Sequence, residues 1–524
     1  MRVVAAVALS VCCLVRVGVA RAQTDSGPLP DAAGAPVTPP APATPDGGAP
    51  VEVPATGSEP GLFEQSTAAA AAAPAGDIAA QPATPPVGPF TLSGYVRGDM
   101  FAGKVNDVNA AELKSGYGEL DLTLRTRKET YGDGFAEARL RYGLQGDGTQ
   151  GTVVEVREAY VNAYLGPLDL RFGQQIVVWG RADALNPTNN LTPVDFRIRS
   201  PLEDDIRLGN AGARAFLRFA PFRLEGVWMP IYLPTELPAV ALPQYVSYGP
   251  PAFPSVDLKN GTEGARLHFE IPAVDLSISY VHGFAPLPGL SITQQNGMDA
   301  ITLTADANSN PSPTMPPSIL ISRTAYEQQV LGGDFATSLG DFGTLRGEVA
   351  YRRPYDWSVP ADYHIAYPEL QYVLGADHSF GSLSVIVQYM GRYVFDWQKQ
   401  NGSTFDTSTL PMRQPADLNS VSQTADDILR KDNQILFSQT ARVQHLGTLR
   451  FEWLGLHETL SISSLCLLNF TTHEWLVTPR IGYKLSDAMM AYLGAQVFHG
   501  PMDTLFGIID AELSSGYVEL RYTF

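Results

Sequence analysis

Alternation of apolar and polar residues dominates the chain from residue 90 to residue 524. Residues 120–125, with the sequence LDLTLR, place leucine at every second position, and residues 274–280, VDLSISY, follow the same pattern. Successive side chains of an extended strand point to opposite faces, so this period of two predicts strands with one apolar and one polar face. The chain contains no uninterrupted apolar run of 18 residues, which argues against a membrane-spanning helix.

About eighteen strands are expected, within a range of sixteen to eighteen. They are residues 90–101, 115–128, 134–144, 153–165, 168–178, 211–220, 222–230, 262–271, 273–283, 326–339, 342–353, 369–379, 381–394, 434–446, 448–458, 474–485, 488–499 and 512–524. Short turns, such as 166–167 and 340–341, alternate with long links, such as 179–210 and 395–433. This alternation is typical of a transmembrane barrel, whereas a soluble sandwich mixes its loop lengths at both ends. The expected fold class is therefore all-β, a transmembrane antiparallel barrel over residues 90–524.

The last strand ends on an aromatic residue. Residues 517–524, YVELRYTF, alternate without a break and finish with Phe524. A terminal aromatic residue on an amphipathic strand resembles the insertion signal of bacterial outer-membrane barrels. We therefore expect the barrel assembly machinery to be a partner of the chain through Phe524.

The first 89 residues do not show the alternation. Residues 1–22 combine a charged start, an apolar stretch and the sequence Ala20-Arg21-Ala22, which together predict a secretory signal peptide. Residues 23–89 hold 15 of the 41 prolines, no Lys or Arg and few large apolar residues. Such a segment cannot bury a core, so it is expected to be a disordered periplasmic arm rich in Pro and Ala, with the cell wall as a candidate partner.

Charge and cysteine content narrow the class of protein. The formal net charge of −18 argues against nucleic acid as a partner, because phosphate binding needs a basic face. The surroundings expected for the barrel are outer-membrane lipid and lipopolysaccharide. Two of the three cysteines, Cys12 and Cys13, lie in the expected signal peptide, so Cys466 has no partner for an internal disulfide.

The polar faces of the strands are expected to line the lumen. This assignment turns many basic side chains inward, among them Arg125, Arg139, Arg214, Arg346 and Arg450. Basic side chains outnumber acidic ones on these faces, which favours anions in the pore. The alternative is that Asp and Glu on neighbouring strands neutralise the arginines as cross-strand pairs.

Link 179–210 is the third on the long side. The chain resembles general porins in topology, and this resemblance implies that the third outer loop folds into the barrel and narrows it. Prolines at 187 and 193 stiffen it, because proline fixes its own φ and restricts the preceding residue. Opposed charges across a constriction set selectivity. The candidate constriction residues are Arg181, Asp183, Asp195, Arg197 and Arg199.

Sequence motifs of catalytic and cofactor sites are either absent or lie in a structural context that does not suit them. Residues 146–151 match G-x-G-x-x-G, but strands are expected on both sides, whereas a dinucleotide site needs a following helix. The chain contains no H-E-x-x-H and no G-x-S-x-G. We therefore expect no enzymatic activity, no cofactor and no metal site.

Residues 174–196 carry a family resemblance. The segments QQ at 174–175, WGRAD at 179–183, NP at 186–187 and LTPVDF at 191–196 resemble a stretch of poorly characterised porin-like bacterial outer-membrane barrels. The resemblance is loose over 90–524 and tightest over 153–220. It implies an outer-membrane barrel and leaves the solute open.

The function expected is therefore a porin-like channel for small hydrophilic solutes, leaning toward anions. Two alternatives remain open. One is an exporter of an anionic polymer, guided by the inward arginines. The other is a surface receptor or adhesin without a transport role.

Overall fold

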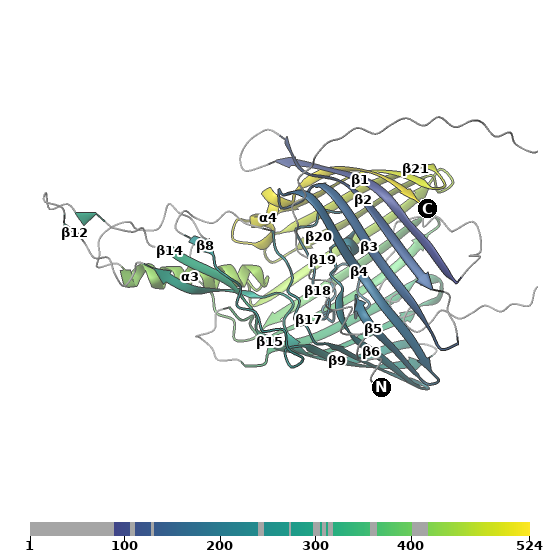
Figure 1. The fold of residues 1–524 in the computed structure, drawn as a ribbon, viewed down its shortest axis with the longest axis horizontal. Helices are drawn as coiled ribbons and strands as arrows, with labels where there is room; N and C mark the ends of the chain where they lie inside the picture. The colour runs from purple at the N-terminus through teal and green to yellow at the C-terminus, as the bar shows by residue number, and fades with distance from the viewer. Residues whose placement is uncertain are drawn as a thin grey trace, which may run out of the picture. The chain divides into compact units, whose positions relative to one another are not determined.

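The structure, a computed structural model, describes residues 89–104, 111–126, 130–238, 246–271, 274–296, 304–305, 311–312, 318–356, 364–400 and 418–524. The expected signal peptide and all but the last residue of the expected arm lie outside these ranges. Within them the chain forms a closed antiparallel barrel, with smaller elements beyond one end of it (Figure 1).

Eighteen strands make up the barrel. In chain order they are β1 (Phe90–Lys104), β2 (Ala111–Thr126), β3 (Gly132–Leu144), β4 (Gln150–Leu165), β5 (Leu168–Gln175), β6 (Asn210–Phe219), β7 (Phe222–Met229), β9 (Thr262–Ile271), β10 (Val274–Phe284), β15 (Glu327–Ser338), β16 (Thr344–Pro354), β17 (Glu369–Phe380), β18 (Leu383–Val394), β19 (Val443–Gly455), β20 (Leu460–Asn469), β21 (Trp475–Ser486), β22 (Met489–His499) and β23 (Ser515–Thr523). Each pairs antiparallel with its neighbour in this order, and β23 pairs with β1. The predicted fold class and strand number are confirmed.

The barrel closes where the two ends of the chain's barrel segment meet. Gly94 of β1 and the terminal Phe524 exchange two backbone hydrogen bonds, at 3.0 and 2.9 Å. Closure satisfies the edge groups of both strands, which no open sheet can do in lipid. The role of Phe524 in assembly stays a prediction.

The structure lacks one of the expected strands and contains one that was not expected. Helix α3 (Leu418–Leu436) includes the first three residues of the expected strand 434–446. Strand β19 starts at Val443 and continues through the break expected between strands 434–446 and 448–458. Strand β20 occupies most of the expected loop 459–473. Ile428, Leu429 and Ile435 are buried and follow a helical spacing, which explains α3. The total stayed at eighteen because one expected strand was lost and one was gained.

The outer face of the barrel is apolar. Met100, Val518, Leu493 and Ile481 are register neighbours on four successive strands, and their side chains are between 45% and 57% exposed. The same faces carry the leucines at 122 and 124 on which the alternation was recognised. A continuous exposed apolar belt around a closed barrel is a lipid-facing surface.

Aromatic side chains border this belt at both ends. Trp228 and Tyr393 are exposed near the strand ends that lead into long links, and Phe219 and Phe380 near the ends that lead into turns. Two aromatic girdles flanking an apolar band are a feature of transmembrane barrels.

The long links carry the remaining elements. β8 (Val246–Tyr248), β11 (Gly289–Asn296) and β14 (Ser318–Thr324) form a small sheet, and the side chain of Asn433 in α3 bonds to both backbone groups of Leu290 in β11. Helix α4 (Leu505–Leu513) lies in the link from β22 to β23, and β12 (Thr304–Ala305) pairs with β13 (Pro311–Ser312). In the described part of the chain, no helix combines the length and hydropathy needed to cross a bilayer.

The lipid-facing belt generates a stability prediction. Leu493→Arg should lower the free energy of unfolding by about 2–4 kcal/mol, because it places a charge near the middle of the apolar band. Equilibrium urea unfolding in lipid vesicles measures this change in the free energy of unfolding. The matched control is Leu258→Arg, at an exposed residue of the link from β7 to β9, where little change is expected. An equal loss in both variants would contradict the placement of the belt.

Candidate functional site

The link between β5 and β6, residues 176–209, enters the barrel. We call it the lumen loop. The side chain of Trp179 is completely buried, together with Val177 and Leu191 of the same loop. They pack against five inward side chains from strands β7, β10, β15 and β16. These side chains are Val227, Met229, Val281, Val330 and Ala350. The Trp179 indole N–H donates to Glu225 Oε1 of β7 at 2.8 Å, so the one polar atom of the ring is satisfied inside the barrel.

Beyond Trp179 the loop is fixed to β15 and β10 by two ion pairs of one arginine. Arg181 contacts Asp334 of β15 at 2.6 Å and Asp275 of β10 at 2.8 Å. Asp334 also accepts from Arg266 of β9 at 2.8 Å. One buried carboxylate thus joins a loop arginine to a wall arginine, which satisfies more of its acceptor positions than a single pair would.

Glu348 of β16 holds the backbone of the same part of the loop. Its Oε1 accepts hydrogen bonds from the backbone N–H groups of Arg181 and Ala182, and its Oε2 accepts from the Thr188 hydroxyl at 3.0 Å. Asp183 then pairs with Arg450 of β19 at 2.7 Å. This end of the lumen loop is therefore anchored on β15, β16 and β19.

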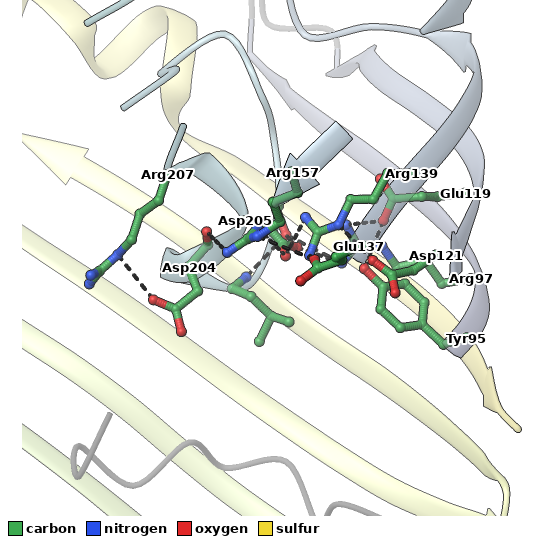
Figure 2. A network of polar contacts seen from close by, with 12 residues as sticks. Tyr95, Arg97, Glu119, Asp121, Glu137, Arg139, Arg157, Asp204, Asp205 and Arg207 are labelled. Atoms are coloured by element: carbon green, nitrogen blue, oxygen red, sulfur yellow. Dashed lines mark hydrogen bonds and ion pairs between the residues drawn. The ribbon is translucent and has the colours of Figure 1, made fainter. Parts of the chain in front are cut away.

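The other end of the loop is anchored by Asp205, in the 3-10 helix η2 (Glu203–Ile206). Its carboxylate lies 2.8 Å from Arg97 of β1, 2.9 Å from Arg139 of β3 and 3.7 Å from Arg157 of β4. Figure 2 shows these guanidinium groups converging on Asp205. Burial opposes ionisation of this carboxyl, but Arg97, Arg139 and the Ser200 hydroxyl outweigh it and hold the pKa of Asp205 below its usual range.

Neighbouring carboxylates complete this network. Arg97 also meets Glu119 of β2 at 2.7 Å, and Arg139 meets Asp121 at 2.9 Å and Glu137 at 3.1 Å. Arginines and carboxylates therefore alternate through this network. A buried charge network is stable only when each charge is paired, and Asp205 supplies the carboxylate that three of these arginines share.

The two anchors lie on opposite walls of the barrel. In the ring of eighteen strands, β15 lies nine strands from β1 in both directions. Asp334 on β15 holds Arg181, and Arg97 on β1 holds Asp205. The lumen loop therefore crosses the full width of the barrel.

The middle of the loop is held near the long-link end. Asp195 pairs with Arg197 at 2.7 Å, and Arg197 lies 3.7 Å from Glu236 of the next long link. Arg199 donates to the backbone carbonyl of Glu512 at the C-terminus of α4 at 2.5 Å. The Tyr117 hydroxyl of β2 donates to the backbone carbonyl of Arg199 at 2.6 Å.

The wall arginines predicted from the sequence fall into two groups. Arg139 and Arg450 contact the lumen loop directly, and Arg214 reaches it through Glu225, which it meets at 2.7 Å. Arg346 instead pairs with Asp377 on the adjacent strand at 2.7 Å, and Arg125 lies exposed over the ring of Phe135, 5.0 Å from its centroid. The structure does not bring the last two to the loop.

Four of the residues that anchor the loop were not among the predicted site residues. These are Asp205, Asp334, Glu348 and Arg97. Alternation places the three strand residues on an inward face. It carries no signal that would pair them with a particular loop residue.

Ion pairs with carboxylates also compensate much of the positive charge expected in the lumen. Most of the inward arginines contact a carboxylate, as Arg266, Arg352 and Arg392 do on β9, β16 and β18. Within the described ranges no group of three His, Cys, Asp or Glu side chains could hold a metal ion. The site is thus a charged loop inside a barrel whose wall charges are largely compensated.

These features define a transmembrane β-barrel of the outer-membrane type with a loop across its lumen. Residues 91–371 match the family described as protein of unknown function (DUF1302), and the chain belongs to that family. No curated protein matches the sequence.

The chain is also similar, at low sequence identity, to solved structures that include Occ proteins and a porin. OccAB3 of Acinetobacter baumannii is 10% identical, with 83% of this chain and 99% of that chain covered and a TM-score of 0.45. OccK3 (OpdO) of Pseudomonas aeruginosa is 11% identical, with 83% and 95% covered and a TM-score of 0.44. A mutant of the Rh. blastica porin is 11% identical, with 83% and 100% covered and a TM-score of 0.34.

The Asp205 cluster generates a prediction with a neighbouring control. Asp205→Asn should cost about 3–5 kcal/mol of unfolding free energy, because it leaves buried arginines without their shared carboxylate. Asp204→Asn, whose carboxylate is 68% exposed and meets only the half-buried Arg207, should cost about 0–1 kcal/mol. Equilibrium unfolding in lipid vesicles compares the two.

The same cluster predicts the direction of a pH effect. Because the pKa of Asp205 is lowered in the folded protein, its contribution is present above the unfolded value of about 4 and is lost as the pH falls below it. The difference between wild type and Asp205→Asn should therefore shrink in acid. A difference that grows in acid would contradict the assigned role.

Proposed function

We propose that this protein is an outer-membrane channel for small hydrophilic solutes, without enzymatic activity, in which the lumen loop forms the constriction. The observation that carries the proposal is the anchoring of one loop on opposite walls. Asp205 of the loop pairs with Arg97 of β1, and Arg181 of the loop pairs with Asp334 of β15. An eighteen-stranded barrel has a lumen wide enough for water unless something fills it. A loop across that lumen divides its cross-section and brings its own charges into the path of a solute.

We propose further that the short turns and the arm face the periplasm, while the long links face outward. The distribution of link lengths supports this orientation, since outer-membrane barrels have short periplasmic turns and longer outer loops. The small sheet of β8, β11 and β14 would then lie outside the cell.

The proposal also includes a preference for anions. The inward arginines were the reason to expect it, but a guanidinium paired with a carboxylate adds little to the field in the pore. Arg197 is also paired, with Asp195, but its side chain is 41% exposed, whereas those of Arg181 and Arg199 are buried, so it is the constriction arginine that a solute can meet. We therefore expect a modest anion preference that depends on this residue.

Releasing one anchor tests the constriction. Arg181→Ala combined with Asp183→Ala removes the pairs with Asp334 and Arg450 and should raise the single-channel conductance in planar bilayers. The control is Arg346→Ala, which breaks a wall pair that does not involve the loop and should leave conductance unchanged. An equal conductance in all three proteins would place the constriction elsewhere. A wild type that passes no current would favour the receptor or adhesin alternative.

Reversing the charge of Arg197 tests selectivity. Arg197→Glu should shift the reversal potential in a potassium chloride gradient toward that of potassium. Arg125→Glu, exposed at the turn end of β2, is the matched control and should shift it less. If the two variants move the reversal potential equally, a general surface charge and not the loop sets the preference.

A further inference from the structure

Three polar aromatic side chains meet on the lipid-facing side of the barrel near the long links. Tyr372 of β17, Gly391 of β18 and His445 of β19 are register neighbours. A Cβ atom on Gly391 would collide with the ring of Tyr372, so this ring lies across the glycine toward His445. Tyr389 of β18 completes the group, with its ring centroid 6.3 Å from that of Tyr372 and 6.0 Å from that of His445. Exposures of 41% for Tyr372 and 40% for Tyr389 place the group on the open surface of the barrel.

His445 presents a hydrogen-bond donor to this surface. Its Nδ1 lies 2.6 Å from the hydroxyl of Tyr389, and the residue is exposed. An imidazole that accepts at Nδ1 carries its proton on Nε2, and no group in the described ranges accepts a hydrogen bond from Nε2 of His445. A donor that faces lipid without a partner is costly, so its acceptor is expected among the headgroups that border the apolar belt.

Exposed rings continue from this group around the barrel. One register row runs from Tyr389 across β19 and β20 to Trp475 of β21 and His499 of β22. The ring of Phe470, just after β20, lies beside Gly447 and is 53% exposed, and Trp475 meets His499 with ring centroids 5.2 Å apart. We call this surface the outer patch, formed by Tyr372, Tyr389, His445, Phe470, Trp475 and His499.

The charge of the outer patch favours an anion. No carboxylate in the described ranges lies within ion-pair distance of His445, and the carboxylate there that approaches His499 is Asp510, with 4.0 Å between its oxygen and Nδ1. The exposed part of β10 differs, since His282 lies 3.5 Å from the carboxylate of Glu263, which is 69% exposed. That carboxylate would repel an anion near His282, whereas His445 has no such neighbour.

A phosphate on a sugar has the chemistry that this surface recognises. Phosphate oxygens accept charge-assisted hydrogen bonds from an imidazole N–H, and sugar hydroxyls exchange hydrogen bonds with tyrosine hydroxyls. Tryptophan and tyrosine rings lie where headgroups meet the apolar core of a membrane. The C–H faces of a sugar ring pack on such rings, and a phospholipid headgroup without a sugar lacks those faces.

We propose that the outer patch binds the phosphorylated sugar headgroup of lipopolysaccharide, with His445 donating to a phosphate oxygen. The inference rests on the proposed function, whose orientation of the barrel places the long-link end in the outer leaflet. It adds a lipid ligand and the residues that hold it, and it does not depend on what passes through the lumen.

Titration of the full-length protein in detergent micelles with fluorescently labelled lipopolysaccharide tests the outer patch. Fluorescence anisotropy gives the dissociation constant. We expect His445→Ala to raise this constant about tenfold, because a hydrogen bond to a charged group is lost. The matched control is His282→Ala on β10, which removes a histidine elsewhere on the outer face and should bind as the wild type does.

A second pair of variants tests the ring surface. Trp475→Ala should also weaken binding, because it removes a ring on which the sugar packs. Trp228→Ala of β7, which is 42% exposed near the same end of the barrel, should leave the dissociation constant unchanged. An unchanged far-ultraviolet circular dichroism spectrum shows that each variant is folded.

Two further ligands identify the group that is bound. Lipopolysaccharide stripped of its phosphates should bind the wild type about tenfold more weakly and should no longer distinguish it from His445→Ala. Phosphatidylglycerol, which carries a phosphate but no sugar, should compete only weakly.

The outcomes separate this inference from the channel proposal. Equal binding of lipopolysaccharide by the wild type, His445→Ala and His282→Ala would overturn the outer patch. Equal competition by phosphatidylglycerol would overturn it in favour of a general anionic-lipid surface, and a dimer that dissociates in His445→Ala would identify a second copy of the chain as the occupant instead. None of these results bears on the channel function, which is tested by the conductance of the wild type.

Discussion

Closure of the barrel is the constraint on which the rest of this structure depends. Lipid offers no hydrogen-bond partners, so every backbone group of the spanning segment must be paired within the protein. The pairing of β23 with β1, completed by Gly94 and Phe524, leaves no strand edge open. Once the ring is closed, the pleat sends alternate side chains into lipid and into the lumen, and eighteen strands make that lumen too wide for wall side chains to fill. A loop that spans it needs anchors on both sides.

The anchors are charged groups, and the free-energy cost of burying a charge explains why several donors surround each of them. Burying a carboxylate is costly unless several donors surround it. Asp205 meets this requirement with arginines from three strands, and Glu348 with backbone N–H groups and a hydroxyl of the loop. Because each anchor uses partners from the wall and from the loop, the loop has one position in which all charges are satisfied. Ion pairs whose attraction is largely offset by the cost of burying the charges can in this way still fix the position of the loop.

Much of the fold could be predicted because alternation reports the two faces directly. Leu120, Leu122 and Leu124 identified the lipid side before any contact was known. The partners of the loop could not be predicted, since Asp205 and Arg97 are more than a hundred residues apart in sequence and only closure of the ring brings them together. The same holds for Arg181 and Asp334. The sequence indicated that the loop enters the barrel but not which wall residues receive it.

The one barrel strand that alternation failed to predict is also the most informative. Alternation does not mark β20, LSISSLCLLN, as a strand, because apolar residues occur on both of its faces in the half nearest the long links. A strand in a lipid-exposed barrel needs only its outer face to be apolar, so leucine at 465 and 467 is not explained by the membrane. Local rules are broken most often where a site requires it. On β17 to β19 the lumen loop covers the equivalent residues, which accounts for them as packing. On β20 to β22 the apolar row continues through Leu476 to Phe498, which meets Phe506 of α4, and Leu465 and Leu467 are themselves buried, so packing inside the barrel accounts for these leucines as well.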